Sequence, residues 1–236
     1  MTEDNIDKLI PAHGGFKKLR SFVVSLAVYD GTVIFCDRLV SYRSRTKDQM
    51  VQAARSGVQN IAEGSLASAT SKKIELKLTS IARASLGELI RDYEDYLCQN
   101  GLDIWHKDSV RVVKMRDRLA GKLPPPAGSL DIEALKMSNR ADVFDEPILA
   151  ALHTIKSALP EVCANIMLCM SHQASFLIGR QLKRLEKDFV EHGGFTERMY
   201  RTRQARRKAG FREETRAWPE RLAGSDLSDQ SEIPDF

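Results

Sequence analysis

The side chains best suited to acid–base or metal chemistry are histidines and a group of carboxylates. The histidines are His13, His106, His153, His172 and His192. They lie far apart in the sequence, without the short spacings of metal ligands, and His172 is expected to be a core or interface residue. The carboxylates are Glu88, Asp92, Glu94 and Asp95. Such a run is usually a solvated helix face, and Arg83 and Arg91 are close enough along a helix to pair with it.

The sequence lacks the signatures of several common enzyme and metal sites. A di-iron site in a helical bundle needs two Glu-x-x-His motifs, and the nearest match is a single Asp103-x-x-His106. No GxxxxGK[ST] phosphate loop and no Gly-x-Ser-x-Gly elbow occur. The cysteines have no CxxC spacing and are expected to be reduced and buried; they are Cys36, Cys98, Cys163 and Cys169. We therefore expect no enzyme activity, no cofactor and no metal.

Lys and Arg side chains form the second chemically useful set, because they bind phosphate groups. Residues 15–55 carry eight Lys or Arg against three Asp or Glu, and residues 180–208 carry ten against four. Residues 209–236 carry three against seven. This pattern indicates an anionic partner, an acidic tail that screens the basic segment, or a solvated surface on which charges happen to cluster. The expected nucleic-acid-binding residues are Lys17, Lys18, Arg20, Arg43, Arg45, Lys47, Lys72, Lys73, Arg180, Lys183, Arg184, Arg198, Arg201, Arg203, Arg206 and Arg207.

Long amphipathic helices are predicted to position these side chains. Apolar residues at 22, 26, 29, 33, 36 and 40 alternate spacings of four and three, which predicts a helix over about 16–40. Further helices are expected over about 46–63, 71–100 and 160–192. Gly64 is expected to end the second of these helices, and the Gly-Gly at 193–194 the last.

The remaining segments are predicted to be an N-terminal extension (1–14), an insert (101–158), a suffix (193–209) and a tail (210–236). In the insert we expect a basic helix over 105–120, a PPPAGS linker and short helices near 131–137 and 148–158. The suffix is expected to be a short basic helix and the acidic tail to be disordered. The stretch 162–179 has no Asp, Glu, Lys or Arg, yet its polar residues indicate a buried soluble helix. With no visible signal peptide, a cytoplasmic location is expected.

These elements predict an all-α fold, an antiparallel up-and-down four-helix bundle over 15–209 with a helical insert before the fourth helix and a basic helical suffix. The fourth helix repeats Val162, Ile166, Cys169, Gln173 and Phe176 at helical spacing. This seam adds apolar surface beyond what three helices need, and we therefore expect a homo-oligomer.

The stretch RSGVQNIAEG (55–64) is interpreted as a helix-packing motif rather than a catalytic cluster. Small residues let helix axes approach closely, and a glycine inside a helix costs about 1 kcal/mol relative to alanine. Gly57 is therefore expected to face another helix closely. Asn60 and Glu63 are expected to hydrogen-bond across the pair or to a neighbouring subunit. The motif comprises Gly57, Asn60, Glu63, Gly64, Ser85 and Glu88.

The same segments resemble a known family. QMVQAARSGVQNIAEG, followed by TSKKIELKLTSIARASLGEL, is similar to the four-helix-bundle proteins of intervening sequences in bacterial large-subunit rRNA genes and to the accessory proteins of diversity-generating retroelements. The resemblance covers about residues 14–100. The stretch RQLKRLEKDFVEHGGFTERMYRTR resembles the suffix of one branch of that family. The middle of the chain, about 101–158, resembles nothing we can place.

The resemblance implies an antiparallel four-helix bundle, a barrel-like homopentamer and a binding activity without catalytic residues. The implied partners are other copies of the chain, the RNA or DNA backbone, and a reverse transcriptase or other protein. The polar residues of 162–179 lead us to expect no membrane partner. Our first hypothesis is a non-enzymatic oligomeric nucleic-acid-binding protein that serves an RNA or reverse-transcriptase process. The alternative is a structural or protein-interaction scaffold without nucleic-acid binding.

Overall fold

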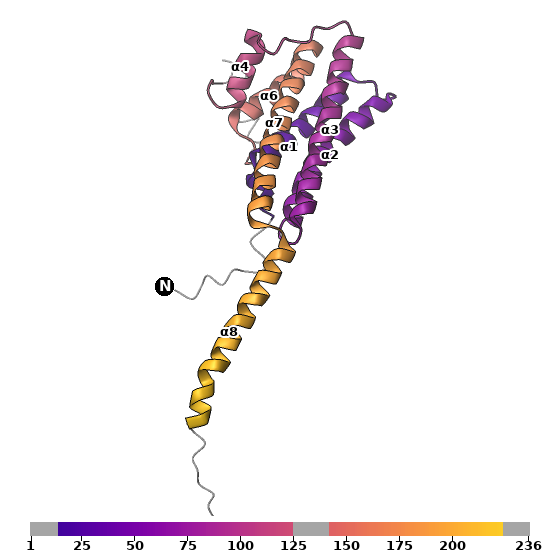
Figure 1. Ribbon diagram of the computed structural model, residues 1–236. Helices are drawn as coiled ribbons and strands as arrows, with labels where there is room; N and C mark the ends of the chain where they lie inside the picture. Colours follow the sequence, from indigo (N-terminus) through magenta and orange to yellow (C-terminus); the bar gives the residue numbers. More distant parts are fainter. Residues whose placement is uncertain (1–13, 125–141, 224–236) are drawn as a thin grey trace, which may run out of the picture. The chain divides into compact units, whose positions relative to one another are not determined.

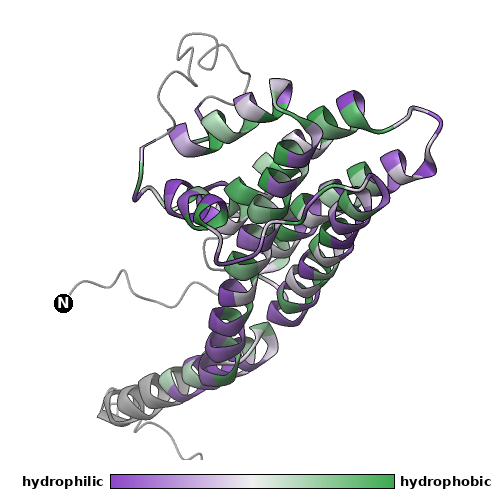
Figure 2. Ribbon diagram, turned by 90° about the horizontal axis from the view of Figure 1, so that it is seen from above, coloured by the Kyte–Doolittle hydropathy of each residue, from purple (hydrophilic) through white to green (hydrophobic). Residues whose placement is uncertain are grey.

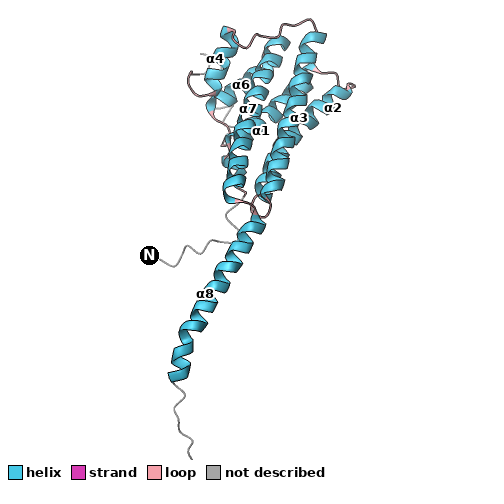
Figure 3. Cartoon of the chain, viewed as in Figure 1, coloured by secondary structure: helices cyan, strands magenta, loops and turns pink. Residues whose placement is uncertain are grey.

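The regular elements in the computed structural model are all helical within the residues that it describes, 14–124 and 142–223, of which 210–223 are described by backbone alone (Figures 1 and 3). The all-α prediction is therefore confirmed. The elements are η1 (Gly15–Lys18), α1 (Arg20–Leu39), α2 (Arg45–Ala67), α3 (Lys72–Gln99), α4 (Val110–Leu119), α6 (Glu146–Ser157), α7 (Pro160–His192) and α8 (Phe195–Ala223). Residues 12–192 form one compact unit, and α8 belongs to a second one.

Side-chain caps fix where several of these helices begin. Ser44 accepts a hydrogen bond from the Thr46 amide at the start of α2, and Ser71 accepts one from the Ile74 amide at the start of α3. Ser109 and Asp145 cap α4 and α6 in the same way. Each cap satisfies an amide that has no partner inside its own helix, which stabilises the helix by about 1 kcal/mol.

Four long helices build the core: α1 packs against α2 and α7, and α3 packs against the same two helices. Ser21, at the start of α1, donates to Gln181 late in α7, whereas Arg38, at the end of α1, reaches Cys163 at the start of α7. The two helices are therefore antiparallel. The α2–α3 pair is antiparallel too, because Gly57 lies beside Leu86 and Gly64 beside Glu75.

Large apolar and aromatic side chains fill the space between these helices. Figure 2 shows hydrophobic and hydrophilic residues alternating along the helix ribbons. The Phe35 ring is fully buried and meets Tyr93 and Tyr96 edge-to-face, with ring centroids 5.0 and 4.9 Å apart. The Tyr93 hydroxyl donates to Thr32 at 2.9 Å, so the buried phenol is satisfied. Burial raises the pKa of Tyr93 well above its usual value, which keeps the phenol neutral.

The insert folds onto the core through two arginines of α1. Arg20 forms an ion pair with Asp145 at 2.6 Å and donates to the Leu119 carbonyl at 3.2 Å. Arg38 donates to the carbonyls of Ile155 and Ala158 at the end of α6. Those carbonyls have no partner inside α6, so the two arginines hold both ends of that helix on α1.

Two residues of the apolar seam expected to lie between copies are buried within the chain itself. Ile166 and Cys169 are 7% and 8% exposed, and Ile166 lies in a pocket that α4 and α6 also line. Phe176, farther along α7, is 64% exposed. Ile166 and Cys169 therefore do not need a second copy for their burial, and the homo-oligomer stays a prediction.

Two predicted helix ends are wrong. Gly64 does not end α2, which continues to Ala67. A Cβ at Gly64 would lie 3.3 Å from the Glu75 carbonyl oxygen, so this glycine permits close approach to α3 instead. The suffix helix does not end near 209, because α8 runs to Ala223 and residues 210–223 of the supposedly disordered tail are helical. Arg, Glu, Ala and Leu dominate that stretch, and all favour helices.

Other sequence predictions fall outside the described residues. These are most of the N-terminal extension (1–13), the PPPAGS linker beyond Pro124, the short helix expected near 131–137 and the end of the acidic tail (224–236). In the remainder of the insert, the basic helix expected over 105–120 is shorter and forms α4. The helix expected near 148–158 forms α6, which begins two residues earlier than predicted.

Two predictions of burial also need correction. Cys36, Cys163 and Cys169 are buried, but Cys98 is exposed. Burial raises the pKa of Cys36 to about 12 and that of Cys169 to about 11, so both remain thiols at neutral pH. His172 is exposed on α7, so its expected place in the core is wrong, and a place in an interface stays a prediction.

The helix that begins at Pro160 is long and apolar enough to span a membrane by length and composition alone. However, 61% of the apolar window is buried inside the protein. A helix that is apolar on all sides is typical of a protein core as well as of a membrane span, and this finding is weak evidence for a membrane.

Gly57 lies inside α2 and faces α3, as predicted. A Cβ at this position would lie 3.0 Å from Leu86 Cδ2, and Leu86 is fully buried. We expect Gly57→Leu to destabilise the fold by about 1–3 kcal/mol through overpacking. Urea unfolding followed by circular dichroism measures this change.

Gly87 provides a matched control, because it also lies inside a helix but has open space around its Cβ position. Gly87→Leu should leave stability unchanged or raise it by up to about 1 kcal/mol, since glycine is a poor helix former. Equal stability of Gly57→Leu and the parent would show that α2 and α3 do not require the small residue.

Candidate nucleic-acid interface

Several predicted basic residues lie at one end of the 12–192 unit. The Gly14 amide donates to the Ser65 carbonyl, which brings η1 to the end of α2 and hence to the α2–α3 turn. Lys17 and Lys18 of η1 and Lys73 of α3 are all exposed there. The starts of the first and third helices therefore share one end, and their lysines are open to solvent.

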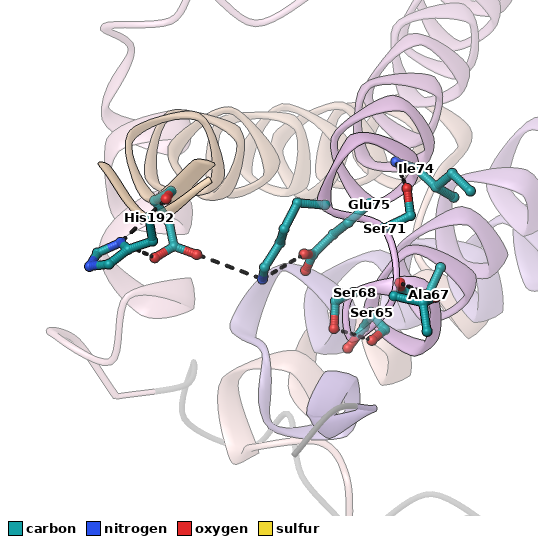
Figure 4. Close-up of polar contacts among 10 residues, drawn as sticks. Ser65, Ala67, Ser68, Ser71, Ile74, Glu75 and His192 are labelled. Carbon is teal, nitrogen blue, oxygen red and sulfur yellow. Dashed lines mark hydrogen bonds and ion pairs between the residues drawn. The ribbon is translucent and has the colours of Figure 1, made fainter. Parts of the chain in front are cut away.

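Lys72 is at the same end but its charge is compensated. Its ammonium is 3.0 Å from Glu75 and 3.7 Å from Asp188, and Asp188 also contacts His192 at 3.1 Å. Figure 4 shows this chain of contacts from Glu75 to His192. Only 19% of the Lys72 side chain is exposed. Lys72 therefore ties α3 to α7 and is poorly placed to bind a phosphate.

The basic residues of α7 extend this end of the unit. Arg180, Lys183 and Arg184 are exposed, and Gln181 beside them bonds to Ser21 at the start of α1. Gly179 of α7 lies against the guanidinium of Arg83 on α3: a Cβ added at Gly179 would be 3.5 Å from the Arg83 Cζ atom. Three α7 cations thus join those of η1 and α3.

The second predicted group lies at the opposite end, in the turn between α1 and α2. Arg43 and Arg45 are exposed, and the Arg43 Nε donates to the Tyr42 hydroxyl at 2.8 Å. Lys47 forms an ion pair with Asp37 at 2.8 Å, and that hydrogen bond raises the pKa of Lys47. Two of these three cations remain without a carboxylate partner among the described residues.

Arg20 was predicted to bind nucleic acid, but its side chain makes contacts within the chain. Its guanidinium bonds both to Asp145 and to the Leu119 carbonyl. These contacts join α1 to α4 and α6, and they occupy the side chain that was expected to bind phosphate.

Helix α8 carries the remaining predicted cations. Arg203, Arg206 and Arg207 are exposed, whereas Arg201 donates to the Glu197 carbonyl at 3.4 Å and Arg198 is half-buried. The mostly exposed stretch 195–209 contains few apolar side chains. It therefore offers phosphate groups a row of charges rather than a shaped pocket.

The helix-packing motif also contributes a groove, which is acidic. Asn60 bonds to Ser56 of its own helix instead of crossing to α3, and Glu63 is exposed. The hydrogen bond that joins α3 to α2 is donated by the Ser85 hydroxyl to the Ser56 hydroxyl at 3.1 Å. The small serines leave an open groove between α2 and α3, lined by Asp48, Gln49, Gln52, Ala53, Ser56, Ser85, Glu88 and Asp92.

The acidity of this groove makes the α2–α3 face unsuitable for nucleic acid. Burial raises the pKa of Asp92, and the nearby charges of Asp95 and Glu88 raise it further. The negative charges of these carboxylates repel one another, and they would repel a phosphate group in the groove in the same way. The basic ends of the unit are therefore separated by a face that does not attract polyanions.

Sequence reasoning missed Lys77, which is exposed on α3 one turn after Lys73. The spacing of four residues places both lysines on one helix face, so this signal was available in the sequence.

Among the described residues, no group of three or more His, Cys, Asp or Glu could hold a metal ion.

No family model matches this chain, and neither a curated protein nor a solved structure matches it.

Proposed function

We propose that this chain is a non-enzymatic, cytoplasmic nucleic-acid-binding protein, built as an antiparallel four-helix bundle of α1, α2, α3 and α7 with an insert and a basic suffix. It contacts the phosphate backbone of RNA or DNA and serves an RNA or reverse-transcriptase process. The observation that carries the proposal is the set of exposed cations on α8, foremost Arg203, Arg206 and Arg207, which have no carboxylate within ion-pair distance in the described residues.

Cations within the 12–192 unit support the same function. Lys17, Lys18, Lys73 and the α7 cations are exposed at one end, and Arg43 and Arg45 are exposed at the other. Few aromatic side chains accompany them, so binding relies on charge rather than on base stacking. Weak selectivity among sequences follows, because phosphate contacts carry no sequence information.

The test is a fluorescence-anisotropy titration of the full chain with mixed-sequence RNA and with duplex DNA at low salt. Both nucleic acids should bind, and their affinities should be similar. A chain that binds neither one would have the alternative function, a protein-interaction scaffold without nucleic-acid binding.

We further propose that the chain assembles into a homo-oligomer, most simply a pentamer, which would repeat each basic cluster around a ring. The resemblance of residues 14–100 to ring-forming bundles supports this assembly, as does the large exposed side chain of Phe176 on α7. Repetition of like charges raises the local potential and attracts polyanions more strongly.

Light scattering should give a mass near five times that of the 26.5 kDa chain. The measurement should be made at micromolar concentration and repeated at high salt, so that charge-driven aggregation is separated from a stable ring. A monomer mass under both conditions would overturn the proposed assembly while leaving nucleic-acid binding to its own test.

A further inference from the structure

A small apolar pocket lies where α4 and α6 meet the first turns of α7. Its floor is formed by Ala150 and Ala151 of α6, Val162 and Ile166 of α7, and Met115 of α4. Its volume is about 270 Å³. Pockets for small-molecule ligands usually enclose about 300–1,000 Å³, so this one is of a size for a single large apolar side chain.

Trp105 stands at the edge of this pocket and is held there by α7. Its backbone amide donates to Asn165 at 2.8 Å, and its indole nitrogen donates to Glu161 at 2.8 Å. Asn165 is only 2% exposed and also donates to the Asp103 carbonyl. The indole is therefore a fixed part of the wall.

Basic side chains of α4 line the rest of the rim. Arg111 lies over the Trp105 ring, 5.1 Å from its centroid, and pairs with Glu161 at 3.7 Å. Lys114 and Arg118 have no carboxylate within ion-pair distance among the described residues, although Arg118 donates to the Pro124 carbonyl. The pocket thus combines an apolar floor with two uncompensated positive charges one helical turn apart.

Two large apolar side chains are exposed on the elements that line the pocket. Val110 of α4 is 68% exposed, and Leu159, between α6 and α7, is 73% exposed. Large apolar side chains exposed around a pocket are typical of a protein–protein interface rather than of a small-ligand site.

We propose that this pocket docks an acidic amphipathic segment of a partner protein. One leucine or phenylalanine of that segment enters the pocket, and its flanking carboxylates face Lys114 and Arg118. A bare nucleic-acid backbone fits less well, because phosphate would leave the apolar floor uncovered. One face of Trp105 is also occupied already by Arg111, which limits base stacking.

The probe is a fluorescein-labelled synthetic peptide in which glutamates flank leucine and phenylalanine. Matched peptides carry glutamine or lysine in place of glutamate. Each is titrated against the full chain, and binding is followed by fluorescence anisotropy. In a Trp218→Phe background, Trp105 is the only tryptophan of the chain and reports by its own emission whether the peptide reaches the pocket.

Three variants test the site. Ala150→Leu fills the pocket, and the pair Lys114→Glu and Arg118→Glu reverses the rim charge at accessible positions. The control pair, Arg55→Glu and Arg91→Glu, makes the same charge change on exposed residues of α2 and α3. We expect the glutamate peptide to bind and to shift Trp105 emission, and each pocket variant to weaken it by about tenfold or more. The control pair should bind like the parent.

Three results would overturn the proposal. The first is equal binding of the glutamate and lysine peptides, or no binding of either. The second is that RNA displaces the peptide and depends on Lys114 and Arg118 in the same way, which would assign the site to nucleic acid. The third is peptide binding only after the carboxylates of residues 224–236 are neutralised, which would make this chain's own acidic segment the occupant.

Discussion

Phe35→Ala should destabilise the fold by about 3–5 kcal/mol, the range for removal of a buried phenylalanine side chain. Phe35 is fully buried in α1 and makes edge-to-face contacts with both Tyr93 and Tyr96 of α3. Truncation removes both ring contacts and leaves a cavity between α1 and α3 that rigid helices cannot close. Urea unfolding at fixed protein concentration measures the change in the free energy of unfolding.

Tyr42→Ala is the control, because a ring of similar size is removed from a side chain that is 77% exposed in the turn between α1 and α2. It should change the free energy of unfolding by no more than about 0.5 kcal/mol. If Phe35→Ala were as mild as this control, the aromatic cluster would not be the centre of the core.

Reversal of Arg203, Arg206 and Arg207 to glutamate should weaken nucleic-acid binding by about a hundredfold or more at low salt, because three phosphate contacts are replaced by repulsion. All three side chains are exposed on α8, so the fold should persist and circular dichroism should be unchanged. The measurement is an anisotropy titration of the triple variant and the parent with the same RNA.

Arg111→Glu together with Arg116→Glu is the control for general charge. Both residues are exposed on α4, outside the expected nucleic-acid surface, and their reversal should weaken binding far less. If the two sets of variants lost affinity equally, net charge rather than the suffix would account for binding.

Much of the helical architecture could be predicted from the sequence, because it is encoded locally. Ser44 and Ser71 sit just before periodic apolar segments, and both cap the helices that follow. Gly64 was misread because a glycine near the end of a periodic stretch is commonly a helix stop. Only the tertiary contact with Glu75 shows that its absent side chain serves close packing.

The predicted end of α8 was wrong for a different reason. The excess of carboxylates indicated disorder over 210–236, but it lies in 224–236, whereas 210–223 carry three Arg and three Glu and continue α8 to Ala223. The position of the insert on α1 was not predictable either. It involves contacts of Arg20 and Arg38, whose partners lie about a hundred residues away in the sequence.

The candidate site was predicted only as a list of charges, since a sequence does not show which charges are paired. Arg20, Lys47 and Lys72 all contact carboxylates, whereas Arg43, Arg45 and Lys73 do not among the described residues. The peptide pocket had no sequence signal, because its floor and rim come from three helices that meet only in the fold.

The salt dependence of RNA binding by the parent chain tests the central claim most directly. Anisotropy titrations across several salt concentrations give the slope of log affinity against log salt. Phosphate neutralisation by the exposed arginines predicts a steep negative slope, about −0.7 to −0.9 for each phosphate contacted. A slope near zero, or no binding at the lowest salt, would contradict the account.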